Sequence, residues 1–197
     1  MTIRLPAALA MAVLALTPLA RGQEPSIGAR ISGFTLRGLD GRLQEFPSLK
    51  GQVTVVIFFS TRCPMSNAFN YRRNQLYREF WSQVRFLVID SNVNESLAEV
   101  RTYAKDVGFD FPVYEDVDDA AANIMGARNK TETFVLDQEG IIRYRGYIED
   151  APNPTCTTRQ GLRMAIEDVL AGQPVVFAVT RGIGCAIRRP LMSKQPQ

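Results

Sequence analysis

The middle of the chain alternates between apolar runs and amphipathic stretches. Residues 53–59 and 85–90 are apolar at nearly every position, which is typical of strands buried on both faces of a sheet. Residues 67–81, 95–107 and 118–125 carry apolar side chains at three- and four-residue spacings, which is typical of helices that pack one face on a sheet. The pattern therefore predicts strands alternating with helices.

The two ends of this section predict hairpins. Residues 28–46 contain short alternating segments around an Asp40-Gly41 turn, and residues 133–137 and 141–146 flank a second glycine-containing turn. A final helix is predicted at 158–171, after a proline-containing loop. This order predicts an α/β fold with a central mixed sheet flanked by helices, an N-terminal hairpin and a C-terminal extension.

Residues 1–22 have the pattern of a signal peptide. Arg4 precedes an apolar segment at 5–19, and small residues follow it near position 22. The apolar segment is shorter than the roughly 20 residues that a membrane span needs. We expect an exported protein, periplasmic or extracellular, with one domain at 27–172 and an extension at 173–197. The alternative is a frayed N-terminus of a protein that is not exported.

Charge and composition exclude several classes of function. The net charge of +3 would fall to +1 once Arg4 and Arg21 leave with the leader, so neither nucleic acid nor a membrane surface is an expected partner. Histidine is absent, which excludes serine–histidine hydrolysis, cysteine–histidine proteolysis and most catalytic zinc sites. We expect no cofactor and no metal.

The three cysteines, Cys63, Cys156 and Cys185, are the candidates for chemistry. Their spacing is too wide for a zinc knuckle, and an odd number in an oxidising compartment leaves one thiol unpaired or all three in exchange. Cys63 follows the apolar run 53–59 and precedes Pro64 at a predicted helix start, where backbone N–H groups stabilise a thiolate. The alternative for Cys63 is an inert buried thiol.

The order of the predicted elements and the segment around Cys63 together resemble one family. This is the family of thioredoxin-like redoxins that contains alkyl hydroperoxide reductase and thiol-specific antioxidant, the peroxiredoxin-like proteins. The segment reads Phe58-Phe59-Ser60-Thr61-Arg62-Cys63-Pro64. The extension Gly184-Cys185-Ala186-Ile187-Arg188 is similar to that of an exported thioredoxin-family subgroup. The resemblance implies a thioredoxin-like fold and Cys63 as nucleophile. The substrate-positioning residues that it implies are Ser60, Thr61, Arg62, Pro64 and Thr131.

Ser66 stands where thioredoxin has its second cysteine, so Cys63 must be resolved by Cys156, Cys185 or an external thiol. The fold implied by the resemblance places the loop with Cys156 beside the nucleophile, while residues 172–184 are long enough to return Cys185 to the same edge. The subgroup resemblance favours Cys185. We expect a thiol oxidoreductase that acts on peroxides or protein disulfides and needs an external thiol reductant. The alternative is a catalytically decayed binding or structural module with a Cys156–Cys185 disulfide.

Overall fold

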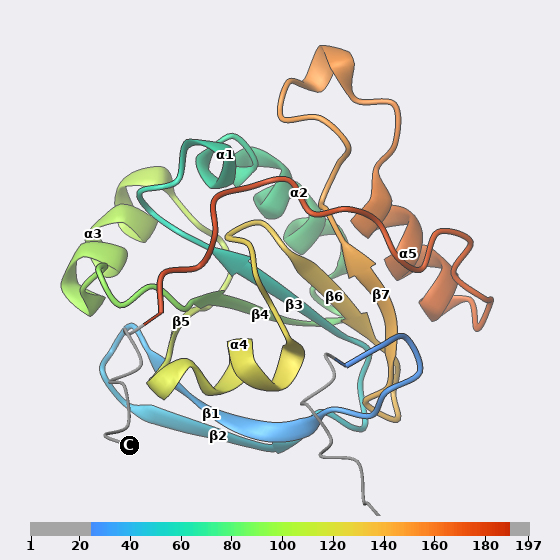
Figure 1. Cartoon of the computed structure of the whole chain (residues 1–197), viewed down its shortest axis with the longest axis horizontal. Helices are drawn as coiled ribbons and strands as arrows, with labels where there is room; N and C mark the ends of the chain where they lie inside the picture. Colours follow the sequence, from blue (N-terminus) through green and yellow to red (C-terminus); the bar gives the residue numbers. More distant parts are fainter. Residues whose placement is uncertain (1–24, 190–197) are drawn as a thin grey trace, which may run out of the picture.

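The two apolar runs form the central strands of a sheet in the computed structural model, which describes residues 25–189 (Figure 1). They are β3 (Thr54–Phe59) and β4 (Arg85–Asp90), and all six residues of β3 are buried. Successive side chains of a strand point to opposite faces, so Val55 and Ile57 join one apolar cluster while Val56 and Phe58 join the other. The lack of alternation in the sequence thus reflects a sheet that is covered on both sides.

Seven strands in the described part of the chain are ordered β2-β1-β5-β4-β3-β6-β7. The three inner strands β3, β4 and β5 are parallel, and every other neighbouring pair is antiparallel. The sheet is therefore mixed, as predicted, and both hairpins are confirmed. The remaining strands are β1 (Ser32–Gly38), β2 (Leu43–Ser48), β5 (Val113–Asp116), β6 (Thr133–Leu136) and β7 (Ile142–Gly146).

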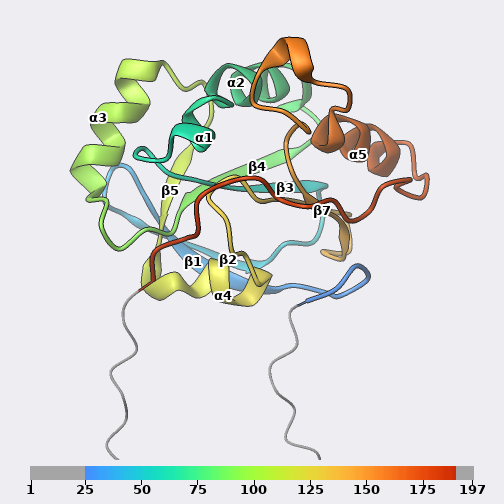
Figure 2. The ribbon, with the colours of Figure 1, turned by 45° about the horizontal axis from the view of Figure 1, so that its top comes forward.

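Helices cover both faces of the sheet. Figure 2 shows α2, α3 and α5 on one face and α4 on the other, and the two apolar clusters divide their residues in the same way. The helices are α1 (Pro64–Asn67), α2 (Asn70–Phe80), α3 (Leu97–Val107), α4 (Ala120–Met125) and α5 (Gly161–Leu170). Two 3-10 turns, η1 (Val117–Asp119) and η2 (Pro154–Cys156), complete the set.

All four predicted helices begin later than the pattern indicated, and the last of them, predicted at 158–171, is α5, which begins at Gly161. The helix predicted at 67–81 is α2, which is separated from the short α1. The helix predicted at 95–107 begins after Ser96, whose hydroxyl accepts a hydrogen bond from the Glu99 N–H at 3.3 Å. The helix predicted at 118–125 begins only at Ala120, because Asp118 and Asp119 have φ angles of 55° and 54°.

The C-terminal extension forms a strap that runs from β7 to the loop before β6. The strap is defined as residues 178–189 (red in Figure 1). It first pairs with β7, where the Arg145 N–H donates to the Ala178 carbonyl at 2.8 Å. It then pairs with the loop before β6, through a bridge between Asn129 and Ala186. The predicted signal peptide at 1–22 and residues 190–197 lie outside the described residues. No helix within 25–189 is long and apolar enough to cross a membrane.

Candidate active site

Cys63 lies at the carboxyl end of β3, where it is the N-cap residue of α1. Pro64 occupies the first turn of that helix, a position in which its missing N–H costs no hydrogen bond. The Cys63 side chain is only 1% exposed. The predicted strand–cysteine–helix junction is therefore present, but the thiol lies beneath other parts of the chain.

The strap covers Cys63 and brings Cys185 to it. The two Sγ atoms lie 2.8 Å apart although 122 positions separate the residues in sequence, and all three cysteines are free. Cys185 itself is exposed. The pair thus has a shielded member on the sheet and an exposed member on the strap.

Three contacts hold this part of the strap. The Lys130 N–H donates to the Cys185 carbonyl at 2.9 Å, and the Ile187 N–H donates to the Arg128 carbonyl at 2.9 Å. The hydroxyl of the buried Thr131 donates to the Ile183 carbonyl. Gly184 passes so close to this threonine that a Cβ there would lie 2.6 Å from Thr131 Oγ1. Thr131, which is expected to position substrate, also contacts the strap.

The two thiols have opposite electrostatic environments. Burial raises the pKa of Cys63, but hydrogen bonds from the Cys185 thiol and from backbone N–H groups, chiefly that of Ser66, outweigh it and leave the pKa below its ordinary value. The hydrogen bond to Cys63 and then burial raise the pKa of Cys185. Of the two thiols, Cys63 is therefore the more acidic, and the hydrogen bond between the sulfurs stabilises its ionised form.

The loop before Cys63 is held by a buried carboxylate. Glu95 accepts hydrogen bonds from the Ser60 hydroxyl, from the Thr61 hydroxyl and from the Thr61 N–H, the last at 2.6 Å. Lys130 Nζ lies 3.7 Å from the same carboxylate and 3.4 Å from Ser60 Oγ. Ser60 and Thr61 therefore fix the loop, and sequence reasoning missed Glu95 and Lys130. The only signal for Glu95 was its place just before a helix cap.

A second buried charge, Arg73, was also missed. Its side chain is 1% exposed, donates to Ser66 Oγ at 2.9 Å and stacks over the Phe59 ring at 5.8 Å. Burial lowers the pKa of Arg73 to about 10, although attraction to Tyr103 and then to the Cys63 thiolate opposes that change. Arg73 lies on the same face of the helix as Phe69, Leu76 and Phe80, which are all buried. A cation among these apolar positions was the signal in the sequence that could have indicated a buried arginine.

Asp90, at the end of β4, is the neighbour of Phe59 in the sheet. Burial first, and then the charge of Glu95, raise the pKa of Asp90 to about 8, while hydrogen bonds from Asn92 and the charge of Lys130 oppose the rise. One carboxylate oxygen, Oδ2, has no hydrogen-bond partner in the described part of the chain. An acid that holds its proton at neutral pH thus lies beside the buried Glu95–Lys130 pair.

Two other predicted site residues, Arg62 and Cys156, are bonded to groups other than the two sulfurs. Arg62 is bound through Nε and a terminal nitrogen to the two carboxylate oxygens of Glu99, at 2.6 and 2.7 Å. Cys156 is exposed in η2, where its Sγ lies 3.9 Å from Thr155 Oγ1. The alternative pairing of Cys156 with Cys185 differs from the arrangement seen, because the Cys185 sulfur contacts Cys63.

A cavity of about 600 Å³ opens onto the two sulfurs. Three of the residues that line it are cations, and none carries a carboxylate. The lining residues are Arg62, Cys63, Asn94, Lys130, Cys185, Ala186, Ile187 and Arg188. Within the described residues, no group of histidine, cysteine or acidic side chains is arranged to hold a metal. The site is therefore a pair of thiols in a positively charged recess.

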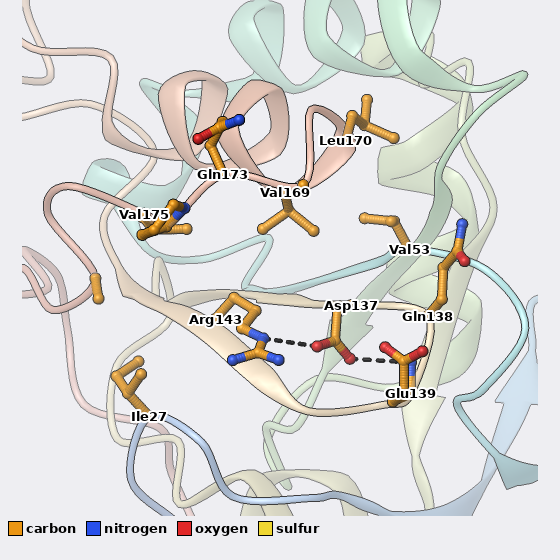
Figure 3. Close-up of a pocket in the computed structure, with 13 residues that line it drawn as sticks. Ile27, Val53, Asp137, Gln138, Glu139, Arg143, Val169, Leu170, Gln173 and Val175 are labelled. Carbon is orange, nitrogen blue, oxygen red and sulfur yellow. Dashed lines mark hydrogen bonds and ion pairs between the residues drawn. The ribbon is translucent and has the colours of Figure 1, made fainter.

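A second cavity, of about 660 Å³, lies between the end of α5 and the β6–β7 hairpin and contains no cysteine. Figure 3 shows Arg143 and Asp137 pointing toward each other on one side, and Val169, Leu170 and Val175 on the other. The Arg143 Nε atom lies 2.6 Å from an Asp137 carboxylate oxygen. Both charges of this pair are satisfied within the protein.

The sequence profile of the AhpC/TSA family matches residues 27–145. No curated protein matches the chain. A solved structure of an uncharacterized conserved protein from Geobacillus kaustophilus is 24% identical, with a TM-score of 0.77 over 85% of this chain and 94% of that one. A hypothetical protein from Sinorhizobium meliloti is 25% identical, with a TM-score of 0.75 over 85% and 97% of the two chains. A putative thioredoxin from Neisseria meningitidis is 20% identical, with a TM-score of 0.59 over 72% and 89%. The predicted thioredoxin-like fold is thus confirmed.

Proposed function

The chain belongs to the AhpC/TSA family, and from this premise we propose that it is an exported thiol oxidoreductase in which Cys63 is the nucleophile and Cys185 resolves it. The family supports thiol oxidoreductase activity in general. The observation that carries the finer assignment is the 2.8 Å separation of the two Sγ atoms. No second cysteine follows Cys63 in α1, where Ser66 stands instead, so the strap supplies the second thiol.

The reaction begins with the Cys63 thiolate. With a hydroperoxide, Cys63 attacks the terminal oxygen, the O–O bond breaks, and the products are a Cys63 sulfenic acid and, after protonation, an alcohol or water. With a disulfide substrate, Cys63 forms a mixed disulfide and releases one thiolate. Cys185 then attacks the Cys63 sulfur and displaces water or the second thiol. Both routes end at the same Cys63–Cys185 disulfide, which an external thiol reduces.

The lowered pKa of Cys63 and the raised pKa of Cys185 support this division of labour. A thiolate is the attacking form of cysteine, and a neighbouring thiol hydrogen-bonded to it is placed for the second step. Substrate reaches Cys63 only when the strap moves, because the thiol is 1% exposed.

Residues 1–22 are the basis for proposing export. Expression with its own leader, followed by cell fractionation and mass measurement, tests it, and a full-length protein that stays in the cytoplasm would contradict it.

The test compares the wild type with three single substitutions, Cys63→Ser, Cys185→Ser and Cys156→Ser. Each protein is given hydrogen peroxide or, separately, a small disulfide, together with an excess of thiol reductant, and turnover is measured. We expect Cys63→Ser to abolish turnover, Cys185→Ser to lower it, and Cys156→Ser to leave it close to wild type. Turnover that survives Cys63→Ser would refute the proposal, and a loss in Cys156→Ser without a loss in Cys185→Ser would show that Cys156 resolves Cys63.

A further inference from the structure

The cavity beside the two sulfurs has a one-sided charge. Three of its eight lining residues are cations, and none is an acid. Glu99 and Glu95 bind Arg62 and Lys130, but neither glutamate lines the cavity. Arg188 forms no ion pair within residues 25–189 and is exposed. The recess therefore presents at least one uncompensated positive charge to whatever enters it.

The same cavity distinguishes the two sulfurs once they are joined. Cys185 is exposed, whereas Cys63 is 1% exposed, so an incoming thiolate meets the Cys185 sulfur first. Cys63 is also the better leaving group, because hydrogen bonds from backbone N–H groups stabilise its thiolate. Steric access and leaving-group stability thus select the same direction of attack.

Resting on the function proposed above, we infer that the electron donor is a small thiol that carries a carboxylate, that it attacks Cys185, and that Arg188 selects it. A cavity of about 600 Å³ is in the range that small-molecule ligands occupy in proteins. The carboxylate lies against the Arg188 guanidinium, and the sulfur of the donor reaches Cys185. Charge complementarity then raises the local concentration of the donor and orients it.

The step balances as two thiol exchanges. The donor thiolate forms a bond with Cys185 Sγ while the Cys63–Cys185 bond breaks, and Cys63 departs as a thiolate. A second donor thiolate attacks the donor sulfur of this mixed disulfide and releases Cys185, which takes a proton. Two donor thiols are oxidised to one disulfide, and the protein gains two electrons and returns to its reduced state.

The experiment measures how fast mercaptoacetate, mercaptoethanol and cysteamine reduce the oxidised full-length protein. These donors are anionic, neutral and cationic, and each rate is divided by the rate of the same thiol with a small neutral disulfide. We expect mercaptoacetate to exceed mercaptoethanol by about fivefold, the effect of one unit charge a few ångströms away in water, and the preference to shrink as salt is added. Cysteamine should be the slowest of the three.

Arg188→Gln should bring the mercaptoacetate and mercaptoethanol rates together, while Arg188→Lys should keep the preference. The main-chain contacts of Arg188 survive both changes, since its carbonyl accepts from the Val93 N–H. The matched control is Arg181→Gln, which removes the same charge from an exposed position of the strap that does not line the cavity. It should behave as the wild type.

Alkylation during the reaction with mercaptoacetate, followed by peptide mass measurement, locates the mixed disulfide. We expect it on Cys185, with Cys63 alkylated. Equal normalised rates for the anionic and neutral donors in the wild type, an unchanged preference in Arg188→Gln, or an adduct on Cys63 would each overturn the inference while leaving the proposed function intact. If oxidation produces no Cys63–Cys185 disulfide, the proposed function fails, and this inference fails with it.

Discussion

Single residues around Cys63 determine its ionisation. The thiol lies at the start of α1, accepts hydrogen bonds from backbone N–H groups and from Cys185, and is close enough to Arg73 for their charges to attract. The sequence located Cys63 because a strand, a cysteine and a proline follow one another. It did not locate Arg73, because arginine on a helix ordinarily faces solvent and only the stripe of buried neighbours indicated otherwise.

Arg73→Met removes a buried positive charge that attracts the Cys63 thiolate and should raise the pKa of Cys63. The pH dependence of Cys63 alkylation in the reduced protein measures this directly, since the thiolate is the reactive form. Arg73→Lys keeps the charge and should restore most of the difference. The control is Arg78→Met on the same helix, where the arginine is exposed and pairs with Asp110. A Cys63 profile that does not change in Arg73→Met would contradict this role.

Asp90 couples stability to pH. Its pKa is raised to about 8, so the native protein holds a proton that the unfolded chain loses near pH 4. The stabilisation from this proton is fully present below the unfolded pKa and is lost as pH rises toward the folded pKa. Asp90→Asn stays neutral, so its unfolding free energy relative to wild type should increase with pH, by up to about 1 kcal/mol per pH unit between those values.

Urea unfolding of wild type and Asp90→Asn at several pH values between the two pKa values checks this dependence. Asp106→Asn, at an exposed position of α3, is the matched control and should show no such change. A constant difference between Asp90→Asn and wild type across the range would show that Asp90 is ionised throughout.

At the scale of elements, the topology explains why the strap meets Cys63. Because β3 and β6 are antiparallel, the loop before β6 lies at the carboxyl end of β3, and the strap pairs with that loop. The length of the extension allowed Cys185 to reach the carboxyl end of β3. Length alone could not show which residues of the strap pair with which residues of the loop before β6. The sequence also missed β5, whose four residues include Glu115 and Asp116 and show no apolar run.

Gly184→Ala should displace the strap. A Cβ at this position would lie 2.6 Å from Thr131 Oγ1, so the main chain must shift away from Thr131 and move Cys185 with it. Misplacement of a reacting group by about 1 Å costs up to about a hundredfold in rate, and we expect a loss of this order in the formation of the Cys63–Cys185 disulfide. Gly182→Ala is the milder control, since its Cβ meets only the Asn129 side chain, at 3.3 Å.

Stopped-flow oxidation with peroxide separates the two steps of the reaction in these variants. Sulfenic acid formation on Cys63 should be at least as fast in Gly184→Ala as in wild type, because a looser strap exposes the thiol. The second step alone should slow. Disulfide formation at the wild-type rate in Gly184→Ala would mean that the strap tolerates the displacement.

At the scale of the whole molecule, the proposed disulfide joins the centre of the sheet to the chain end. It would close a loop of 122 positions, which restricts the unfolded chain and stabilises the folded protein by about 2–4 kcal/mol. The oxidised protein should therefore melt roughly 5–10 °C above the reduced protein. The difference should vanish in Cys185→Ser and persist in Cys156→Ser. A difference that vanishes instead in Cys156→Ser would indicate the other pairing.

The most direct measurement of the central claim is disulfide mapping. The reduced protein is treated with one equivalent of hydrogen peroxide, remaining thiols are alkylated, and peptide masses identify which cysteines are joined. We predict a single product in which Cys63 is linked to Cys185 and Cys156 is alkylated. A Cys156–Cys185 link with Cys63 alkylated, or three alkylated cysteines, would contradict a redox centre built from Cys63 and the strap.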